Sequence, residues 1–475
     1  MEAPLEQAQQ PAAASPLPEN RLIRLPITMK QSAQDLAQSI DCAAEAGFKG
    51  IVVPLALGGL PLFPSPTPKS NHLKPSLPFF KERDVLEEVC ARAETANVRV
   101  YATFNPWRPT GDIPADRVRR WFHHRHEWFS SPPRWRGYRH VSPAVRGFCP
   151  TQDELRRYWG DLLIEAVEGY PLTGVTIEMT EPPFTLRKGR ERCFCAECKA
   201  YAKSRFDLDL SAFLDNLHRE EMLKAWRAMQ ADRVQNWVAY LCQRCHKSRR
   251  GVLLRMRVNS AREPQSPSRP DAQDIDAPPE HLIRPLLAQG MLEGIEFNNI
   301  HLDDDELEDL LQLNLAIWPD DTLLYPAFLA RNCEELARHL PGLRQMPFIG
   351  FEVDWVGQFS AEAAADLKAN CLAEPAFPAE NTPMESVARL FQEISRLAPQ
   401  DSGVPEFLSD MLNFARSPSA TTPLAALDSL VQNLRGLEAR LLQGQVDFGE
   451  SAGLALCRLS QAKRLARLAS HNVGI

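Results

Sequence analysis

Three observations predict an α/β protein built as a (β/α)8 TIM barrel with a C-terminal all-helical region. Short apolar runs alternate with helix-period segments, which is typical of parallel βαβ units. The runs number eight, which is the count that closes such a barrel. No Gly-x-Gly-x-x-Gly motif follows the first run, so an open doubly wound sheet is disfavoured. The predicted strands span residues 22–28, 50–57, 98–107, 174–181, 251–260, 294–300, 322–330 and 348–355.

Helical patterns separate these runs and take over toward the end of the chain. Residues 1–20 are rich in Ala, Pro and Gln and are expected to form a disordered tail, with the barrel over 21–375. Only helical patterns occur over 376–475, and these helices could cover the bottom of the barrel or form a homo-oligomer contact. The predicted helices include 32–46, 81–96, 152–169 and 303–314 in the barrel, and 384–397, 405–415, 422–442 and 452–469 beyond it.

Composition places the chain among ordinary globular proteins. It has 475 residues, of which 44% are hydrophobic and 24% are charged, so a fibre or a wholly disordered chain is excluded. The net charge of −7 argues against a general nucleic-acid footprint. No apolar run reaches the length of about 18 residues that a membrane-spanning helix needs. The first residues lack the basic and apolar regions of a secretory signal, so a cytoplasmic protein is expected.

Four insertions follow predicted strand ends, where a barrel of this kind carries its active face. They span residues 58–79, 108–148, 182–200 and 260–280. The second, here termed the basic loop, combines arginines and histidines with tryptophans. Aromatic faces stack on sugars or bases, and arginines bind anions. A glycan lid, a nucleic-acid contact and a structural loop packed on the barrel rim are therefore three open interpretations, of which the nucleic-acid contact is the weakest.

Four of the eleven cysteines are predicted to hold a structural metal ion. Cys193, Cys195 and Cys198 form a Cys-x-Cys-x2-Cys segment, and Cys149 lies upstream in a Gly-Phe-Cys-Pro turn. Three thiols this close together cannot all pair with one another as disulfides, whereas four thiolates suit a tetrahedral Zn²⁺. Four thiolates leave no open coordination position, so the zinc would be structural and would clamp two loops together. The alternative is four unrelated buried thiols.

The same region carries a resemblance to a known family. It contains Cys149-Pro150, then a strand Gly-Val-Thr-Ile-Glu-Met-Thr-Glu that ends at Glu181, then Cys-Phe-Cys-Ala-Glu-Cys that ends at Cys198. This order resembles glycoside hydrolase family 42 β-galactosidases and related glycoside-hydrolase-like barrels. The resemblance is specific over residues 147–206. It implies a retaining β-glycosidase with an acid at the end of strand four, a Glu nucleophile at the end of strand seven, and a structural zinc site completed by the upstream cysteine.

The sequence departs from that family pattern at two positions. Thr180 precedes Glu181 where the family has Asn, a residue that contacts the sugar 2-hydroxyl in its members. The seventh strand reads Leu-Leu-Tyr-Pro-Ala-Phe from Leu323 and carries no carboxylate, so the family's nucleophile has no counterpart there. Either the chemistry uses other strands or hydrolysis has been lost.

Strand alternation predicts an unusually polar barrel interior, because alternate residues of each strand face the axis. Structural barrels fill this space with Val, Ile and Leu, and buried charges are costly unless they are paired. One interpretation is a set of internal ion pairs with Arg255 and Arg257, and the other is a ligand site at the strand ends. The predicted inward residues include Tyr101, Thr103, Asn105, Thr176, Glu178, Arg255, Arg257, Asn259, Glu296, Asn298, Glu352 and Asp354.

Glycoside hydrolysis needs two carboxyl groups that flank one bond, one as the acid and the other as base or nucleophile. We expect Glu181 to be the acid, by its match to the family position, with Glu178 as its competitor. Asp354 is the expected partner, with Glu296 behind it. Arg257 would hold this partner ionised or bind an anionic sugar group. The other candidates for substrate binding are Asn105, Asn259, Asn298, Trp107, Trp121 and Trp355.

The sequence therefore favours a glycoside-hydrolase-like enzyme that hydrolyses an unidentified glycan with paired carboxylates at the barrel's C-terminal face. The alternative is a catalytically inactive barrel that binds carbohydrate or a protein partner, and the two departures from the family pattern favour it. A metal-dependent hydrolase is a weaker third hypothesis, because strand one carries Arg24, Pro26 and Thr28 in place of a His-x-His pair.

Overall fold

The structure of the protein is a computed structural model, and the chain divides into two units. One unit comprises Glu19–Phe377, and the other comprises Met1–Pro18 with Pro378–Ile475. The residues that the structure describes are 21–73, 79–109, 113–129, 147–179, 193–213, 219–248, 252–259, 279–301, 322–330, 351–355, 359–370, 383–397 and 424–442, with some single positions and short stretches between and after them.

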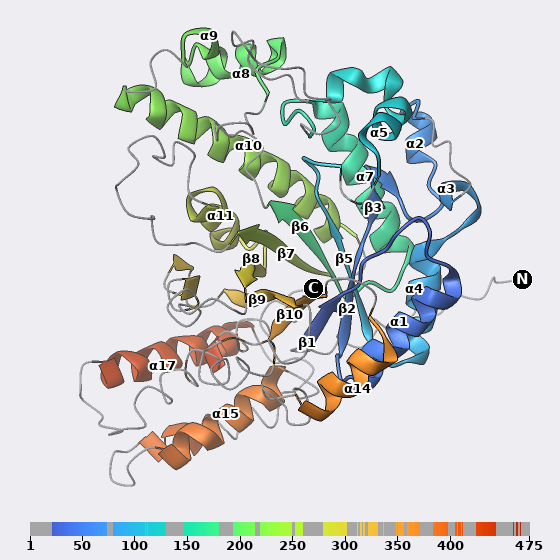
Figure 1. The fold of residues 1–475 in the computed structure, drawn as a ribbon. Coiled ribbons are helices and arrows are strands. Elements are labelled where there is room, and N and C mark those ends of the chain that lie inside the picture. Colours follow the sequence, from blue (N-terminus) through green and yellow to red (C-terminus); the bar gives the residue numbers. More distant parts are fainter. Residues whose placement is uncertain are drawn as a thin grey trace, which may run out of the picture. The chain divides into compact units, whose positions relative to one another are not determined.

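Eight parallel strands close into a barrel in the first unit (Figure 1). Neighbours in the barrel follow the order β1-β10-β9-β8-β7-β6-β5-β2, and every one of these pairs is parallel. The predicted (β/α)8 architecture is thus confirmed. The barrel strands are β1 (Arg21–Arg24), β2 (Gly50–Pro54), β5 (Arg99–Phe104), β6 (Gly174–Met179), β7 (Leu253–Asn259), β8 (Gly294–His301), β9 (Leu323–Ala330) and β10 (Phe351–Trp355).

Helices surround this barrel on its outside (Figure 1). Neighbouring helices contact each other around the ring, with α10 packed against both α7 and α11, and α1 packed against both α4 and α14. The helices of this unit are α1 (Ala33–Glu45), α2 (Thr67–Ser70), α3 (Phe79–Glu82), α4 (Val85–Thr95), α5 (Ala115–Trp121), the 3-10 helix η1 (His123–Trp128), α7 (Asp153–Gly169), α8 (Ala196–Phe206), α9 (Leu210–Phe213), α10 (Glu220–His246), α11 (Pro279–Ala288) and α14 (Ala361–Asn370).

Helix α1 shows why the outer helices begin where the sequence indicates. The Ser32 hydroxyl accepts a hydrogen bond from the backbone N–H of Asp35, and the Asp35 carboxylate accepts one from the backbone N–H of Ser32. This capping box satisfies two backbone donors that the first turn leaves without a helical partner. Leu36, Ile40 and Ala43 follow at helical spacing and are buried against the barrel core.

A short hairpin follows β2 and corrects one predicted boundary. The sequence predicted a single strand over 50–57, but β2 ends at Pro54 and an antiparallel pair, β3 (Ala56–Leu57) and β4 (Leu60–Pro61), follows it. The chain reverses between them at Gly58 and Gly59, whose φ angles are 58° and 87°. These positive φ values favour glycine, so the glycine pair sets the turn that separates the hairpin from the barrel strand.

Two apolar layers are separated by the wall of the barrel. Outward residues such as Val175 and Ile177 are completely buried in the core between strands and helices. A smaller cluster lies inside the barrel and contains Leu22, Val52 and Tyr101. The alternation of the strands therefore gives each one an apolar outer face, and it leaves the rest of the inner face to polar residues.

The described helices of the second unit are α15 (Pro383–Leu397) and α17 (Leu424–Leu442). Val387, Leu390 and Ile394 of α15 are buried at the three- and four-residue spacing of one helix face. Predicted helices 405–415 and 452–469 lie largely outside the described residues, as does the expected tail over 1–20. Among the helices of the described part of the chain, none is long and apolar enough to cross a membrane.

Two glycines offer a test of how tightly the inside of the barrel is packed. A Cβ atom on Gly174 would lie 2.8 Å from the backbone oxygen of Leu253, whereas one on Gly169 meets nothing within 4 Å. We expect Gly174→Ala to lower the free energy of unfolding by about 1–3 kcal/mol, as overpacking does. Gly169→Ala, at the end of α7, should be neutral or stabilising by up to about 1 kcal/mol. Urea unfolding of both variants checks this, and equal stabilities would contradict it.

Candidate functional site in the barrel

Seven ionisable side chains meet along the axis of the barrel. They lie on strands β1, β6, β7, β8 and β10, at positions whose alternation turns them inward. Three are arginines and four are acids, and all of them are joined by ion pairs. This set, here called the axial network, consists of Arg24, Glu178, Arg255, Arg257, Glu296, Glu352 and Asp354.

Arg24 is the centre of the axial network, because its guanidinium contacts all four acids. Its Nη1 lies 2.7 Å from Oε1 of Glu178, and its Nη2 lies 3.1 Å from Oε1 of Glu296. Its Nε donates to Glu352 at 2.8 Å and to Asp354 at 3.0 Å. One planar group thus joins carboxyl groups from three other strands.

Arg257 forms a second bridge among three of these acids. Its Nη1 donates to Glu296 and, at 3.0 Å, to Glu352. Both of its terminal nitrogens contact Asp354, which therefore lies between the guanidiniums of Arg24 and Arg257. Such charge-assisted bonds fix the orientation of a carboxyl group.

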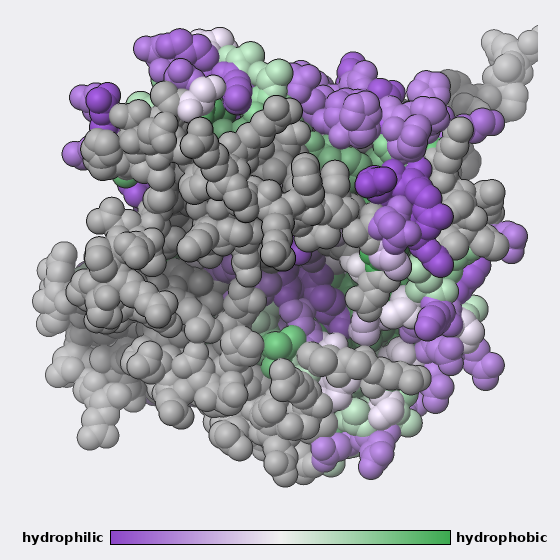
Figure 2. Space-filling model, turned by 45° about the horizontal axis from the view of Figure 1, so that its top comes forward, coloured by the Kyte–Doolittle hydropathy of each residue, from purple (hydrophilic) through white to green (hydrophobic). Residues whose placement is uncertain are grey.

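Exposure divides the network into an inner and an outer part. The side chains of Glu296 and Glu352 are fully buried, whereas those of Glu178 and Asp354 are 16% and 20% exposed. Glu178 and Asp354 are the penultimate residues of β6 and β10, so the outer part lies at the carboxyl ends of the strands. This is the face on which such barrels carry their active sites. Figure 2 shows hydrophilic surface in a recess near the centre of the face that it draws.

Arg255 closes the inner end of the network. Its guanidinium carbon lies 5.0 Å from the ring centroid of Tyr101 and 4.8 Å from that of Tyr325, so the cation is stacked between two aromatic faces. Its Nη2 lies 3.8 Å from Glu296 and 3.9 Å from Glu352. The fully buried arginine thus adds positive charge beneath the two buried acids.

Burial and charge affect the two buried acids in opposite ways. Burial, together with the neighbouring Glu296 and Asp354, raises the pKa of Glu352 to about 8 despite the nearby arginines. Burial also opposes ionisation of Glu296, but Arg257 and Arg24 outweigh it and hold the pKa of Glu296 at about 2. The pKa values of two carboxyl groups in one polar layer are therefore shifted in opposite directions.

Three asparagines predicted to bind substrate lie beside the network or at the strand ends. Asn298 is buried and, with its amide oriented to satisfy both ends, accepts from Nε of Arg257 at 3.1 Å and donates to Asn259 at 2.9 Å. Asn105 follows β5, and its side-chain oxygen accepts from the backbone N–H of Trp107 at 3.0 Å. The structure thus brings Asn259 and Asn298 together with Arg257, while Asn105 shapes the turn after its strand.

The three tryptophans predicted to stack on a sugar lie instead in the apolar core. Trp107 packs against Trp237 of α10, Trp121 packs against Phe80, and Trp355 packs against Phe359. Trp121 is only 1% exposed. Trp355 shares the outward face of β10 with Phe351 and Val353, so its ring points toward the helices. These side chains support the barrel from outside, and they offer no exposed ring to a ligand.

Sequence reasoning missed Arg24 as a functional residue. Arg24 lies two residues after Leu22, which faces the inside of the barrel. Because alternate residues of one strand share a face, this spacing predicts that Arg24 also points inward. Glu352 was placed inward but not among the site candidates. Glu181, residues 180–192 and residues 130–146 of the basic loop lie outside the described residues.

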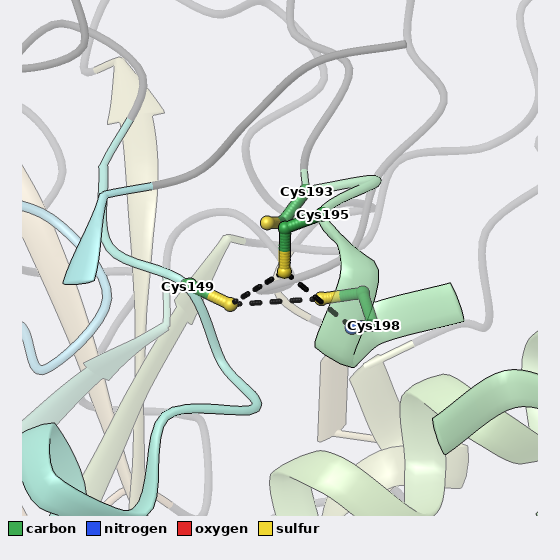
Figure 3. Close-up of side chains that lie close together, drawn as sticks. All are labelled: Cys149, Cys193, Cys195 and Cys198. Atoms are coloured by element: carbon green, nitrogen blue, oxygen red, sulfur yellow. Dashed lines mark hydrogen bonds between the residues drawn. The ribbon is translucent and has the colours of Figure 1, made fainter. Parts of the chain in front are cut away.

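The four cysteines predicted to bind metal do come together (Figure 3). Their sulfur atoms all lie within 4.8 Å of one another. Sγ of Cys149 lies 3.7 Å from that of Cys195 and 3.5 Å from that of Cys198. A zinc ion with Zn–S bonds of about 2.3 Å places its tetrahedral sulfur atoms about 3.8 Å apart. The spacing of this cysteine cluster, Cys149, Cys193, Cys195 and Cys198, therefore fits such an ion.

Local backbone structure also favours charged sulfur in the cluster. Cys195 caps the N-terminus of α8, and its sulfur accepts from the backbone N–H of Cys198 at 3.4 Å. Hydrogen bonds from Cys149 and Cys193 lower the pKa of Cys195. The Thr151 hydroxyl lies 3.0 Å from the sulfur of Cys149. The cluster joins the turn before α7 to the start of α8, segments that are distant in the sequence.

Comparisons with known proteins show that the fold is similar to the barrels of several solved glycoside hydrolases. The sequence matches no family model and none of the curated proteins. Among solved structures, the glycoside hydrolase domain of PgaB (BpsB) from Bordetella bronchiseptica has a TM-score of 0.50 and 14% identity, over 75% of this chain and 99% of that domain. The catalytic domain of β-amylase from Paenibacillus polymyxa has a TM-score of 0.53 and 11% identity, over 76% of this chain and 99% of that domain.

A third similar structure is α-L-fucosidase isoenzyme 2 from Paenibacillus thiaminolyticus. Its TM-score is 0.50 at 13% identity, over 75% of this chain and 49% of the fucosidase. At such low identities the structural similarity establishes the fold alone, and this fold is the one that these three hydrolases have. The residues of a site have to be argued from the chain itself.

Removal of Arg257 tests whether the axial network stabilises the fold. Breaking a buried ion pair leaves uncompensated buried charge, so Arg257→Met should lower the free energy of unfolding by about 3–5 kcal/mol. The matched control is Arg92→Met, because Arg92 pairs with Asp41 at the surface, where the effect should stay below about 1 kcal/mol. Urea unfolding measures both, and an equally small loss for both variants would contradict a coupled buried network.

Proposed function

We propose that the barrel is a glycoside-hydrolase-like enzyme that cleaves a glycan with paired carboxyl groups at its C-terminal face. The observation that carries the proposal is that Glu178 and Asp354 are partly exposed acids held on one guanidinium, that of Arg24. Both lie at the carboxyl ends of strands in a barrel of the glycoside hydrolase kind. Acids in this position can flank a glycosidic bond.

A shared hydrogen-bond donor keeps the two carboxyl groups near each other, which supports this role. Each accepts a hydrogen bond of no more than 3.0 Å from Arg24. Glycoside hydrolysis needs two carboxyl groups that flank one bond.

We assign the base or nucleophile role to Asp354, because Arg24 and Arg257 both hold its carboxylate. Glu181 is the proposed acid, and Glu178 is its alternative. Glu178 accepts from Arg24 and from the Thr103 hydroxyl at 2.9 Å, and these donors suit a carboxylate that accepts rather than donates. Asn298 and Asn259, beside Arg257, are the proposed contacts to sugar hydroxyls.

A carbohydrate-binding barrel without hydrolysis is the second candidate. Strand β9 carries no carboxylate, and the guanidinium of Arg24 stands between Glu178 and Asp354. A substrate would have to bind beside Arg24 or displace it. The two functions differ in whether a bound glycan is cleaved.

A glycan array followed by mass spectrometry separates the two functions. The protein is incubated with each glycan that it captures, and released sugars are measured. We expect release by the unaltered chain and a loss of at least about a hundredfold with Asp354→Asn, as for removal of a general base. Asp41→Asn, on the outer helix α1, is the matched control and should release normally.

Each other result has a definite meaning. Full release by Asp354→Asn would exclude the assigned role of Asp354. Capture without release would favour the binding barrel. Capture of no glycan would count against both carbohydrate functions. Comparison of Glu181→Gln with Glu178→Gln identifies the acid, because only the variant of the acid should lose activity toward substrates with poor leaving groups.

We also propose that the cysteine cluster holds a structural zinc ion. All four sulfur atoms would be ligands, so no position is left for a substrate or a reactive water. Metal analysis of the purified protein should give about one zinc per chain, and Cys198→Ser should lose it. The control is Cys90→Ser, another buried thiol that lies outside the cluster. Equal zinc contents in the two variants would exclude the site.

A further inference from the structure

The two buried acids of the axial network do not have equivalent hydrogen bonds. Oε1 of Glu352 accepts from Nε of Arg24 at 2.8 Å and from Nη1 of Arg257 at 3.0 Å. Oε2 of Glu352 accepts no hydrogen bond from any described residue, and it lies 3.9 Å from Nη2 of Arg255. A buried carboxylate oxygen without a donor is costly, whereas a carboxyl O–H can itself donate.

Glu296, the other buried acid, shares Arg24 and Arg257 with Glu352 but is better supplied with donors. Its Oε1 accepts from Arg24 and Arg257, and its Oε2 lies 3.4 Å from the Thr176 hydroxyl. The carboxylate of Glu296 therefore already has hydrogen-bond donors for both of its oxygens. Oε2 of Glu352 has none among the described residues, so it is the oxygen free to carry a proton.

The charge of the whole network leads to the same assignment. Three guanidiniums face four carboxyl groups, so full ionisation would leave one negative charge uncompensated in a network whose side chains are buried or mostly buried. One proton removes that charge. The titratable and charged groups that face Glu352 from the surrounding strands are Arg24, Tyr101, Glu178, Arg255, Arg257, Glu296, Tyr325 and Asp354.

We propose that Glu352 holds one proton at neutral pH and that this neutral carboxyl group positions Arg24 and Arg257 against Asp354. A neutral Glu352 attracts the two guanidiniums less than a carboxylate would, so Asp354 and Glu178 retain them. Loss of the proton adds a negative charge at the centre and draws both arginines inward. Glu352 is thus a positioning residue. The proton on Glu352 is independent of the proposed function, whereas the catalytic roles of Asp354 and Glu178 rest on it.

The proposal fixes the sign of a pH dependence. The pKa of Glu352 in the folded protein, about 8, lies above the ordinary value of 4.5. The folded chain therefore keeps a proton that the unfolded chain releases. The free energy of unfolding contributed by this group falls as the pH rises from 4.5 to about 8. Glu352→Gln, which cannot lose a proton, should remove that part of the slope.

Infrared spectroscopy of the full chain tests the proton directly, because a carboxylic acid and a carboxylate absorb at different frequencies. We expect a carboxylic acid band at neutral pH that resists deuterium exchange and disappears near pH 8. Glu352→Gln should lack this band. Glu165→Gln should keep it, since Glu165 accepts hydrogen bonds from the Ser65 and Thr67 hydroxyls and lies outside the network.

A second variant tests whether the charge of the network sets the pH at which Glu352 loses its proton. Glu178→Gln removes one negative charge from the network, so the band should disappear at a lower pH than in the unaltered chain. Absence of the band in the unaltered chain at neutral pH would overturn the proposal, even if Glu352→Gln failed to fold. Persistence of the band in a folded Glu352→Gln variant would overturn it too. These readouts need no substrate, so they stand or fall independently of whether the protein cleaves a glycan.

Discussion

The need to balance charge inside a closed barrel underlies the arrangement of this protein. Parallel strands put alternate residues on the axis, and here those residues include three arginines and four acids, of which Arg255, Glu296 and Glu352 are fully buried. Such groups are tolerated only when they are paired and hydrogen-bonded. Arg24 satisfies this condition by bonding all four acids at once, and the positions of the others follow from it.

Along the same network, the exposure of the side chains increases from the inside of the barrel toward the carboxyl ends of the strands. The inner end of the network is fully buried. It consists of Arg255, which lies between two tyrosine rings, and of the acids Glu296 and Glu352. Glu178 and Asp354 form the outer end of the network, and part of their surface is exposed. The guanidiniums of Arg24 and Arg257 orient these carboxyl groups in advance, as the proposed cleavage of a glycan would require.

The cysteine cluster acts on a different part of the barrel. It joins the turn at Cys149, before α7, to the start of α8, after β6. Its sulfur atoms lie in a small apolar cluster with Trp226 and Met229 of α10. The segment between β6 and α8 follows the strand that carries Glu178. With the proposed zinc bound, the cluster would hold the start of α8 against the turn before α7.

The sequence by itself determined the eight-strand barrel, the inward faces and the grouping of four cysteines, because each rests on local periodicity or spacing. It did not determine the hairpin after Pro54, which depends on two glycines with positive φ. The sequence also suggested that Trp121 binds substrate, whereas the Trp121 side chain is buried against Phe80. The role of Arg24 was decided only by tertiary structure, since its four acidic partners are 154 to 330 residues away and meet it only when the barrel closes.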